Sequence, residues 1–252
     1  MGRPCLTHDL ILSLMGIGIT GMTPLSANLV EIFQRGSEIA GILDLPANHW
    51  PGPGQYLPCQ PVSDDAGLLP SHLFRVLGTP GQLTVGPIPV NWQPGDSLIC
   101  TAPQGRGFNL PGSARRVGLI PYGVSPFRLL CLGKQALSQG AVVALYTETM
   151  LPPEVLVGMP SQVEVLPLDA LVENPDWPDF LAIDLERSAI ERFRGQITPE
   201  RLNCGGEVLV RTPMPCRGVG ECGVCAVHTS RGWRLACEHG PVFPMAEVFD
   251  VA

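Results

Sequence analysis

The chain has 252 residues, of which only 15% are charged, and its formal net charge is −7. A nucleic-acid-binding protein needs a basic surface, and an acidic chain with a single lysine, Lys134, argues against that class. Glycine (29) and proline (27) are frequent, but hydrophobic residues make up 45%, so we expect a folded, turn-rich protein rather than a disordered one.

Residues 10–22 form an apolar stretch that is too short to cross a bilayer, because a membrane-spanning helix needs about 20 residues. Arg3 precedes the stretch, as in a secretory signal, but Asp9 adjoins it and glycine and serine interrupt it. We expect residues 1–26 to be a flexible leader or a misassigned start, with a signal peptide as the alternative. For the rest of the chain we expect no membrane span and a cytoplasmic location.

Residues 27–112 consist of short apolar segments separated by turns. Residues 50–62 have Pro and Gly at alternate positions, which restricts them to loop and edge strand. Residues 72–88 predict a hairpin that turns at residues 79–81. Strands that recur about every 8–12 residues predict a small antiparallel β-barrel or sandwich.

Residues 113–202 have a different pattern, in which apolar strands alternate with helices. The predicted strands lie at residues 115–120, 141–148, 162–168 and 179–185, and the predicted helices at residues 127–140 and 188–197. Near-continuous apolar strands that alternate with helices are typical of a parallel sheet covered on both faces, so this region predicts an α/β domain.

Four of the nine cysteines lie within 22 residues near the C-terminus. They are Cys216, Cys222, Cys225 and Cys237. Their spacing, C-x5-C-x2-C-x11-C, has one residue more in the first gap than the plant-type ferredoxin pattern C-x4-C-x2-C with a distant fourth cysteine. Four thiolates can hold a [2Fe–2S] cluster, two on each iron, and the glycines between them would let backbone N–H groups approach the sulfides.

Other uses of these cysteines stay open. A structural zinc ion also accepts four thiolates, although zinc ribbons usually pair two C-x2-C knuckles. A Rieske-type centre with His228 and His239 would leave two cysteines, Cys216 and Cys222, unused, and disulfides would be an unusual role for C-x2-C. We expect residues 224–237 to form a hairpin that returns the last cysteine to the cluster. The other cysteines are expected to be small buried hydrophobic side chains; they are Cys5, Cys59, Cys100, Cys131 and Cys204.

The C-terminal stretch resembles the electron-transfer subunit of the NAD-linked dihydroorotate dehydrogenases, in the ferredoxin-reductase-like superfamily. The resemblance rests on Met-Pro-Cys at residues 214–216, Glu-Cys-Gly-Val-Cys at 221–225 and Gly-Pro-Val-Phe at 240–243, and on motifs at 53–56, 92–96 and 105–108. It implies three domains: an FAD-binding-like β-barrel at residues 27–112, a nucleotide-binding-like α/β domain at 113–202 and a [2Fe–2S] domain at 203–252.

The resemblance also implies cofactor contacts. The positions concerned are Phe74, Arg75, Gly105, Gly107 and Gly123. The family has an arginine for the FAD diphosphate where this chain has His72, and Arg75, one position beyond the retained aromatic Phe74, would point to the opposite strand face. Only Gly123 remains of the glycine-rich loop, and residues 182–185 stand near the place of the Cys-Gly-Pro segment that lines the nicotinamide site in relatives. A barrel that docks a partner without flavin is therefore the alternative.

By this resemblance the chain is an electron-transfer subunit that works with a catalytic flavin dehydrogenase subunit, most directly one that oxidises dihydroorotate in pyrimidine biosynthesis. Electrons would pass between that partner and FAD, and on to NAD, through the cluster. No acid–base catalytic residue is expected on this chain. Two alternatives remain: a reductase subunit for a hydrogenase or for a ferredoxin:NADP oxidoreductase, and a zinc-stabilised binding module without a redox role.

Overall fold

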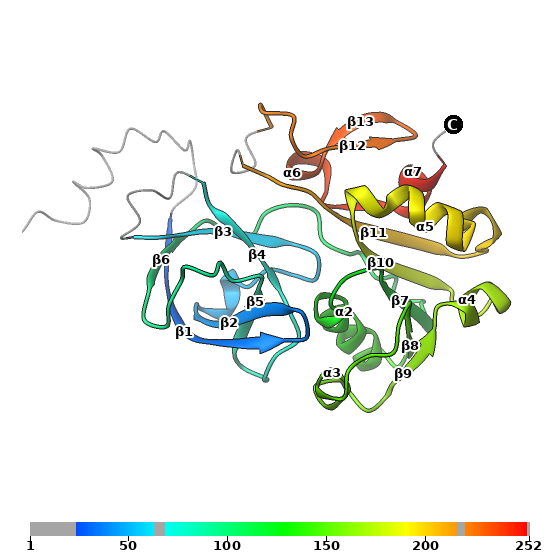
Figure 1. Ribbon diagram of the computed structural model, residues 1–252, viewed down its shortest axis with the longest axis horizontal. Coiled ribbons are helices and arrows are strands. Elements are labelled where there is room, and N and C mark those ends of the chain that lie inside the picture. Colours follow the sequence, from blue (N-terminus) through cyan, green and yellow to red (C-terminus); the bar gives the residue numbers. More distant parts are fainter. Residues whose placement is uncertain (1–23, 63–68, 216–219, 251–252) are drawn as a thin grey trace, which may run out of the picture.

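The computed structural model describes residues 24–62, 69–215 and 220–250. It has a closed β-barrel, an α/β sheet and a C-terminal segment that carries the cysteines (Figure 1). The predicted fold class, an antiparallel barrel joined to a parallel α/β layer and a small cysteine-bearing segment, is confirmed. Within the described ranges no helix is both long enough and apolar enough to cross a membrane.

The barrel consists of six antiparallel strands in the order β1-β2-β5-β4-β3-β6, with β6 closing onto β1. The strands are β1 (Leu25–Arg35), β2 (Glu38–Asp44), β3 (Tyr56–Pro61), β4 (Ser71–Arg75), β5 (Leu83–Gly86) and β6 (Ser97–Cys100), and a short 3-10 turn, η1 (Ala47–His49), follows β2. Alternate side chains such as Leu29, Leu57 and Leu73 fill the interior, as expected for strands with one face toward a core. β1 begins at Leu25, inside the stretch expected to be a leader.

Two barrel cysteines form a disulfide. Cys59 on β3 lies directly opposite Cys100 on β6, both side chains are fully buried, and their Cα atoms are 4.1 Å apart. The expectation that these two residues are only small hydrophobic side chains is therefore wrong, because the pairing of β3 with β6 brings their Cβ atoms face to face. Cys131 and Cys204 are free and half-buried, while Cys5 lies outside the described residues.

The second sheet has six strands in the order β14-β11-β10-β7-β8-β9, all parallel except β14. The strands are β7 (Arg116–Pro121), β8 (Val142–Thr147), β9 (Val163–Pro167), β10 (Phe180–Glu186), β11 (Gly205–Arg211) and β14 (Val242–Pro244). The connections contain α2 (Phe127–Ser138), α3 (Pro153–Val157), α4 (Asp169–Glu173), η2 (Arg187–Ala189), α5 (Ile190–Ile197) and η3 (Pro199–Arg201). Helices α2 and α5 lie on opposite sides of the sheet (Figure 1), so the central strands are buried on both faces, which explains their continuous apolar sequences.

The order in which strands are added to this sheet changes side at β7. It runs from β7 through β8 to β9 on one side, then returns to place β10 and β11 on the other side of β7. The carboxyl ends of β7 and β10 therefore mark a topological switch point, where open α/β sheets generally form their ligand crevice.

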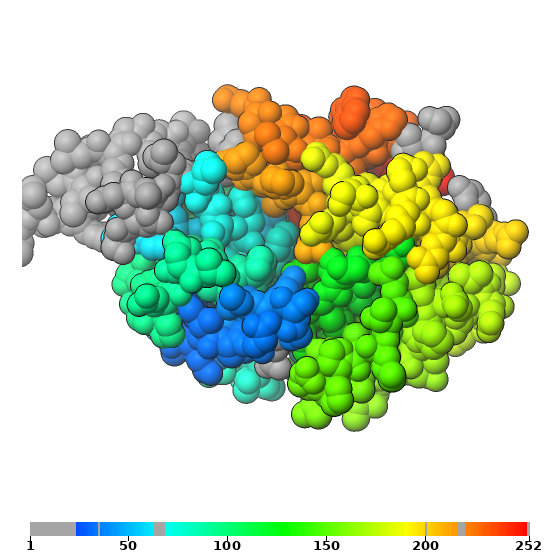
Figure 2. All heavy atoms as spheres, in the orientation of Figure 1, coloured from blue at the N-terminus to red at the C-terminus, as the bar shows by residue number. Residues whose placement is uncertain are grey.

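The C-terminal segment begins after β11 and folds back onto the sheet. It contains the hairpin β12 (Ala226–Thr229) and β13 (Gly232–Leu235), then α6 (Ala236–His239), β14 and α7 (Met245–Phe249). The predicted hairpin is confirmed. β14 pairs with β11, which fixes this segment to the sheet edge. In the space-filling view the orange C-terminal segment lies against both the cyan barrel strands and the yellow part of the α/β region (Figure 2).

Candidate metal centre

Two of the four clustered cysteines meet at the base of the C-terminal hairpin. Cys225 directly precedes β12 and Cys237 lies in α6, directly after β13, so the pairing of the two strands brings both cysteines to one end. Their Sγ atoms are 3.3 Å apart, and both side chains are buried. Two thiolates on one tetrahedral metal ion with bonds of about 2.3 Å lie about 3.8 Å apart. The observed separation is shorter than this but close to it, so the hairpin places Cys225 and Cys237 near enough to share one metal ion, and their role as ligands remains a prediction.

The loop that carries the other two cysteines is only partly described. Cys222 is exposed on this loop, Cys216 lies outside the described residues, and over the described part of the chain no three metal-ligating side chains come together. Gly220 and Gly223 have left-handed φ angles of 81° and 70°, in agreement with the expected role of glycine in turning this loop. The complete four-cysteine ligand set remains a prediction.

Arg187 fixes the ligand loop to the α/β sheet. Its Nη1 atom donates hydrogen bonds to the carbonyl oxygens of Val224, at 2.8 Å, and Ala226, at 2.7 Å, on either side of Cys225. The backbone N–H of Ala236 donates to the carbonyl oxygen of Cys225 at 3.0 Å. Cysteine spacing could not reveal Arg187, because it lies in η2, far along the chain from the cysteines.

The barrel position at which the family has its diphosphate-binding arginine is half-buried and uncharged here. The ring of His72 packs edge-on against the ring of Tyr56, with centroids 4.9 Å apart, and its Nε2 atom is buried without a hydrogen-bond partner among the described residues. Burial lowers the pKa of His72 to about 4, so the ring is neutral at physiological pH. Phe74 is also buried, beneath the guanidinium of Arg128. This stretch does not fit an FAD diphosphate, which needs a cation.

Arg75 points away from Phe74, as predicted. Its guanidinium lies over the ring of Trp50, 5.2 Å from the centroid, and lines a cleft of about 350 Å³ between the barrel and α2. Lys134, the single lysine of the chain, lines the same cleft, and among the described residues no carboxylate side chain is part of its lining. The chemistry of this donor set, two cations beside an aromatic ring, fits the phosphates of a nucleotide.

The three glycines predicted to contact cofactors lie at close packing contacts. A Cβ atom on Gly105, which has φ of +76°, would come within 2.6 Å of Pro241 and 2.8 Å of Tyr56, and one on Gly107 would lie 2.7 Å from the carbonyl oxygen of Pro53. At Gly123, with φ of +67°, the near neighbour is the Arg192 guanidinium at 3.1 Å. Gly105 thus lets a barrel loop pack against the C-terminal segment, and a cofactor contact at these glycines remains a prediction.

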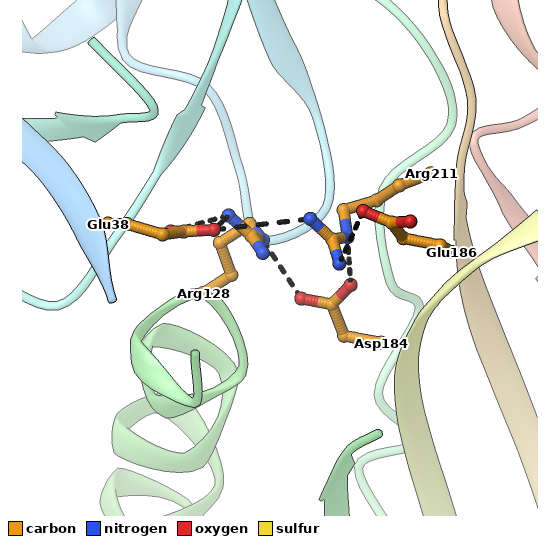
Figure 3. A network of polar contacts seen from close by, with 5 residues as sticks. All are labelled: Glu38, Arg128, Asp184, Glu186 and Arg211. Atoms are coloured by element: carbon orange, nitrogen blue, oxygen red, sulfur yellow. Dashed lines mark hydrogen bonds and ion pairs between the residues drawn. The ribbon is translucent and has the colours of Figure 1, made fainter. Parts of the chain in front are cut away.

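A buried group of charged side chains occupies the carboxyl ends of β7 and β10 (Figure 3). Asp184 on β10 is fully buried, and Arg128 in the first turn of α2 is 2% exposed. Arg128 Nε donates to Asp184 Oδ2 at 2.8 Å, and Arg128 Nη1 donates to Glu38 Oε1 at 2.6 Å. Because Glu38 belongs to barrel strand β2, this group joins the barrel to the α/β sheet.

Arg211 extends the same group to the strand that precedes the cysteines. Its Nε atom lies 3.0 Å from Asp184 Oδ1, and its Nη2 atom lies 3.7 Å from Glu186 Oε1. Burial alone would lower the pKa of Arg128, but the carboxylates of Asp184 and Glu38 outweigh burial and raise it. We call Glu38, Arg128, Asp184 and Arg211 the charge cluster. Sequence reasoning missed it, although Arg128 and Asp184 each interrupt an otherwise apolar segment.

Comparison with known proteins agrees with the sequence motifs. A family model for the iron–sulfur cluster binding domain of dihydroorotate dehydrogenase B matches residues 212–249. The electron transfer subunit of dihydroorotate dehydrogenase B (NAD(+)) from Desulforamulus reducens is 27% identical over 207 residues, which cover 74% of this chain and 76% of that protein.

Solved structures support the fold. A chain of the NADH-dependent reduced ferredoxin–NADP oxidoreductase, described for flavin-based electron bifurcation, superposes with a TM-score of 0.66 at 18% identity, covering 92% of each chain. Ferredoxin–NADP⁺ reductase from Plasmodium falciparum superposes with a TM-score of 0.53 at 13% identity, covering 77% of this chain and 98% of that one. Residues 212–249 thus match the iron–sulfur cluster binding domain of dihydroorotate dehydrogenase B, and the barrel and α/β sheet that precede them have the fold of ferredoxin–NADP oxidoreductases.

Proposed function

We propose that the chain is an electron-transfer subunit of an oxidoreductase. In this proposal Cys216, Cys222, Cys225 and Cys237 hold a [2Fe–2S] cluster that exchanges electrons with a cytoplasmic catalytic subunit of the dihydroorotate dehydrogenase type. The observation that carries the proposal is the approach of the buried Cys225 and Cys237 thiols to 3.3 Å within a matched iron–sulfur domain.

The chain's own residues position and insulate the metal site. A [2Fe–2S] cluster accepts and releases one electron at a time, and burial and hydrogen bonds to sulfur tune its potential. Oxidation of dihydroorotate to orotate would release two electrons and two protons to the partner's flavin, and the electrons would leave through this chain singly. The hairpin sets the separation of Cys225 and Cys237, and Arg187 holds the ligand loop against the sheet.

The resemblance implies FAD, but residues 72–74, where the family has its diphosphate-binding arginine, supply no cation in this chain. His72 is neutral and half-buried, whereas Arg75 and Lys134 line one cleft to which the described residues contribute no carboxylate. We therefore assign the FAD diphosphate to Arg75 and Lys134. FAD bound there would convert between one-electron and two-electron transfer.

Metal and flavin analysis of the purified chain tests the proposal. The wild type should contain iron and acid-labile sulfide and absorb in the visible range. Cys225→Ser should lose this absorbance and electron transfer to the partner, because it removes a ligand. The matched control Cys131→Ser should keep the iron and the acid-labile sulfide, because Cys131 lies in α2, away from the cysteine hairpin, and burial raises the pKa of its thiol to about 12. If both variants retain the full iron content, the ligand assignment is wrong.

A second candidate function is a subunit of a ferredoxin:NADP oxidoreductase. It is favoured by the superposition on the bifurcating oxidoreductase chain, which covers 92% of this chain. Reduction of the cluster by dihydroorotate in the presence of its dehydrogenase supports the first function. Reduction only by reduced ferredoxin supports the second.

A further inference from the structure

In an open α/β sheet of this kind, the crevice at the topological switch point is the usual ligand site. In open α/β sheets, dinucleotides lie outside the carboxyl ends of the strands, with the diphosphate at the N-terminus of the next helix. In this chain that place lies between the ends of β7 and β10, at the start of α2. Gly123, the remaining glycine of the expected phosphate loop, also lies there.

The two walls of this crevice are held together. The backbone N–H of Tyr122, the residue after β7, donates to the carbonyl oxygen of Asp184 on β10 at 2.9 Å, so the pairing continues beyond the end of β7 instead of opening. The hydroxyl of Tyr122 donates to Gln196 and accepts from Arg192 Nε, both on α5, at 2.8 and 3.0 Å. Side chains of α5 thus cover the loop that would otherwise face phosphate.

The space next to α2 is occupied by the protein's own charges. The guanidinium of Arg128, 2% exposed, lies between Asp184 and Glu38 and over the ring of Phe74. We propose that the charge cluster closes the crevice, so that this chain binds no nicotinamide dinucleotide at its α/β sheet. Given the function proposed above, electrons then reach a nicotinamide acceptor only through a site elsewhere or on a partner.

Electrostatics and desolvation both oppose nucleotide entry. A diphosphate that displaced Arg128 would meet the carboxylates of Asp184 and Glu38 and would leave the buried Asp184 without its closest cation. Removing one partner from a buried ion pair corresponds to a loss of roughly two to four orders of magnitude in affinity. An exposed Arg–carboxylate pair would impose almost no such cost, which is why the burial of Arg128 carries the inference.

The test uses the full chain with its cluster loaded, because the visible spectrum then reports the cluster independently of nucleotide binding. NADH, NAD⁺ and NADP⁺ are titrated to millimolar concentration by calorimetry, and amide hydrogen exchange is followed by mass spectrometry. We expect no protection of residues 120–130 or 180–188. An absence of binding, or protection confined to the cleft lined by Arg75 and Lys134, supports the inference.

Saturable binding that protects both segments overturns the inference. Loss of such binding in Arg192→Met, which removes the guanidinium beside Gly123 and its hydrogen bond to Tyr122, would locate the nucleotide at the switch point and refute closure in a second way. A chain without a cluster that still binds no nucleotide would refute the proposed function and leave the closed crevice intact, so the two conclusions fail separately.

Discussion

Substitution of Arg128 by methionine tests whether the charge cluster holds the barrel and the sheet together. Methionine keeps an unbranched apolar stem over Phe74 but removes the guanidinium that contacts Asp184 and Glu38. Asp184 is fully buried, so its carboxylate cannot recover by hydration. In the part of the chain that the structure describes, the one cation that then remains beside this carboxylate is Arg211, 3.0 Å away.

The expected loss in the free energy of unfolding follows from this geometry. Breaking a buried ion pair by removing one partner costs about 3–5 kcal/mol, and the remaining contact with Arg211 places the expected loss near the lower end, at about 3 kcal/mol. For a chain of this size each kcal/mol lowers Tm by about 2–4 °C, which gives a decrease of roughly 6–12 °C. Asp184→Asn introduced into the Arg128→Met chain should lower the free energy of unfolding by less than Asp184→Asn does in the wild type, because both substitutions remove the same interaction.

Chemical denaturation followed by circular dichroism and tryptophan fluorescence measures this loss. Arg116→Met is the matched control, because Arg116 lies 3.9 Å from Asp179 in a half-exposed pair whose removal should cost less than about 1 kcal/mol. If Arg128→Met loses no more stability than Arg116→Met, the charge cluster does not join the domains as described.

Two further changes probe the barrel and its contact with the C-terminal segment. His72 has its pKa lowered to about 4 by burial, against about 6.5 when unfolded. Between these two pH values the unfolded chain therefore binds more protons than the folded chain, and up to about 3 kcal/mol of the free energy of unfolding should be lost as pH falls from 6.5 to 4. His72→Gln should flatten this pH dependence. A variant with the same pH profile as the wild type would contradict the assignment of the dependence to His72. Gly105→Ala should lower the free energy of unfolding by about 2–4 kcal/mol, because its Cβ atom would overlap Pro241 and Tyr56 at a positive φ. Gly205→Ala is the control, because the space around Gly205 is open. Equal losses in the two variants, measured by chemical denaturation, would refute the packing argument.

Local patterns in the sequence were sufficient to predict the architecture. Prolines and glycines between short apolar segments indicated a barrel, and apolar strands alternating with helices indicated a parallel sheet; both are present. The cysteine spacing and the intervening hairpin led to the approach of Cys225 and Cys237. These features depend on residues that are close in the chain.

What the sequence did not reveal depends on contacts between distant segments. The disulfide between Cys59 and Cys100 requires the pairing of β3 with β6, which no local pattern specifies. Arg128 and Asp184 meet only because α2 and β10 converge at the switch point. A charge inside an apolar segment signals a buried partner in general, but the identity of that partner follows from topology alone.

Electron paramagnetic resonance of the reduced chain tests the central claim most directly. A [2Fe–2S] cluster that takes up one electron should give a single unpaired spin per chain, together with equal amounts of iron and acid-labile sulfide. The account predicts this signal in the wild type and in Cys131→Ser, and its absence in Cys225→Ser. A colourless protein that contains zinc and gives no signal after reduction would contradict it.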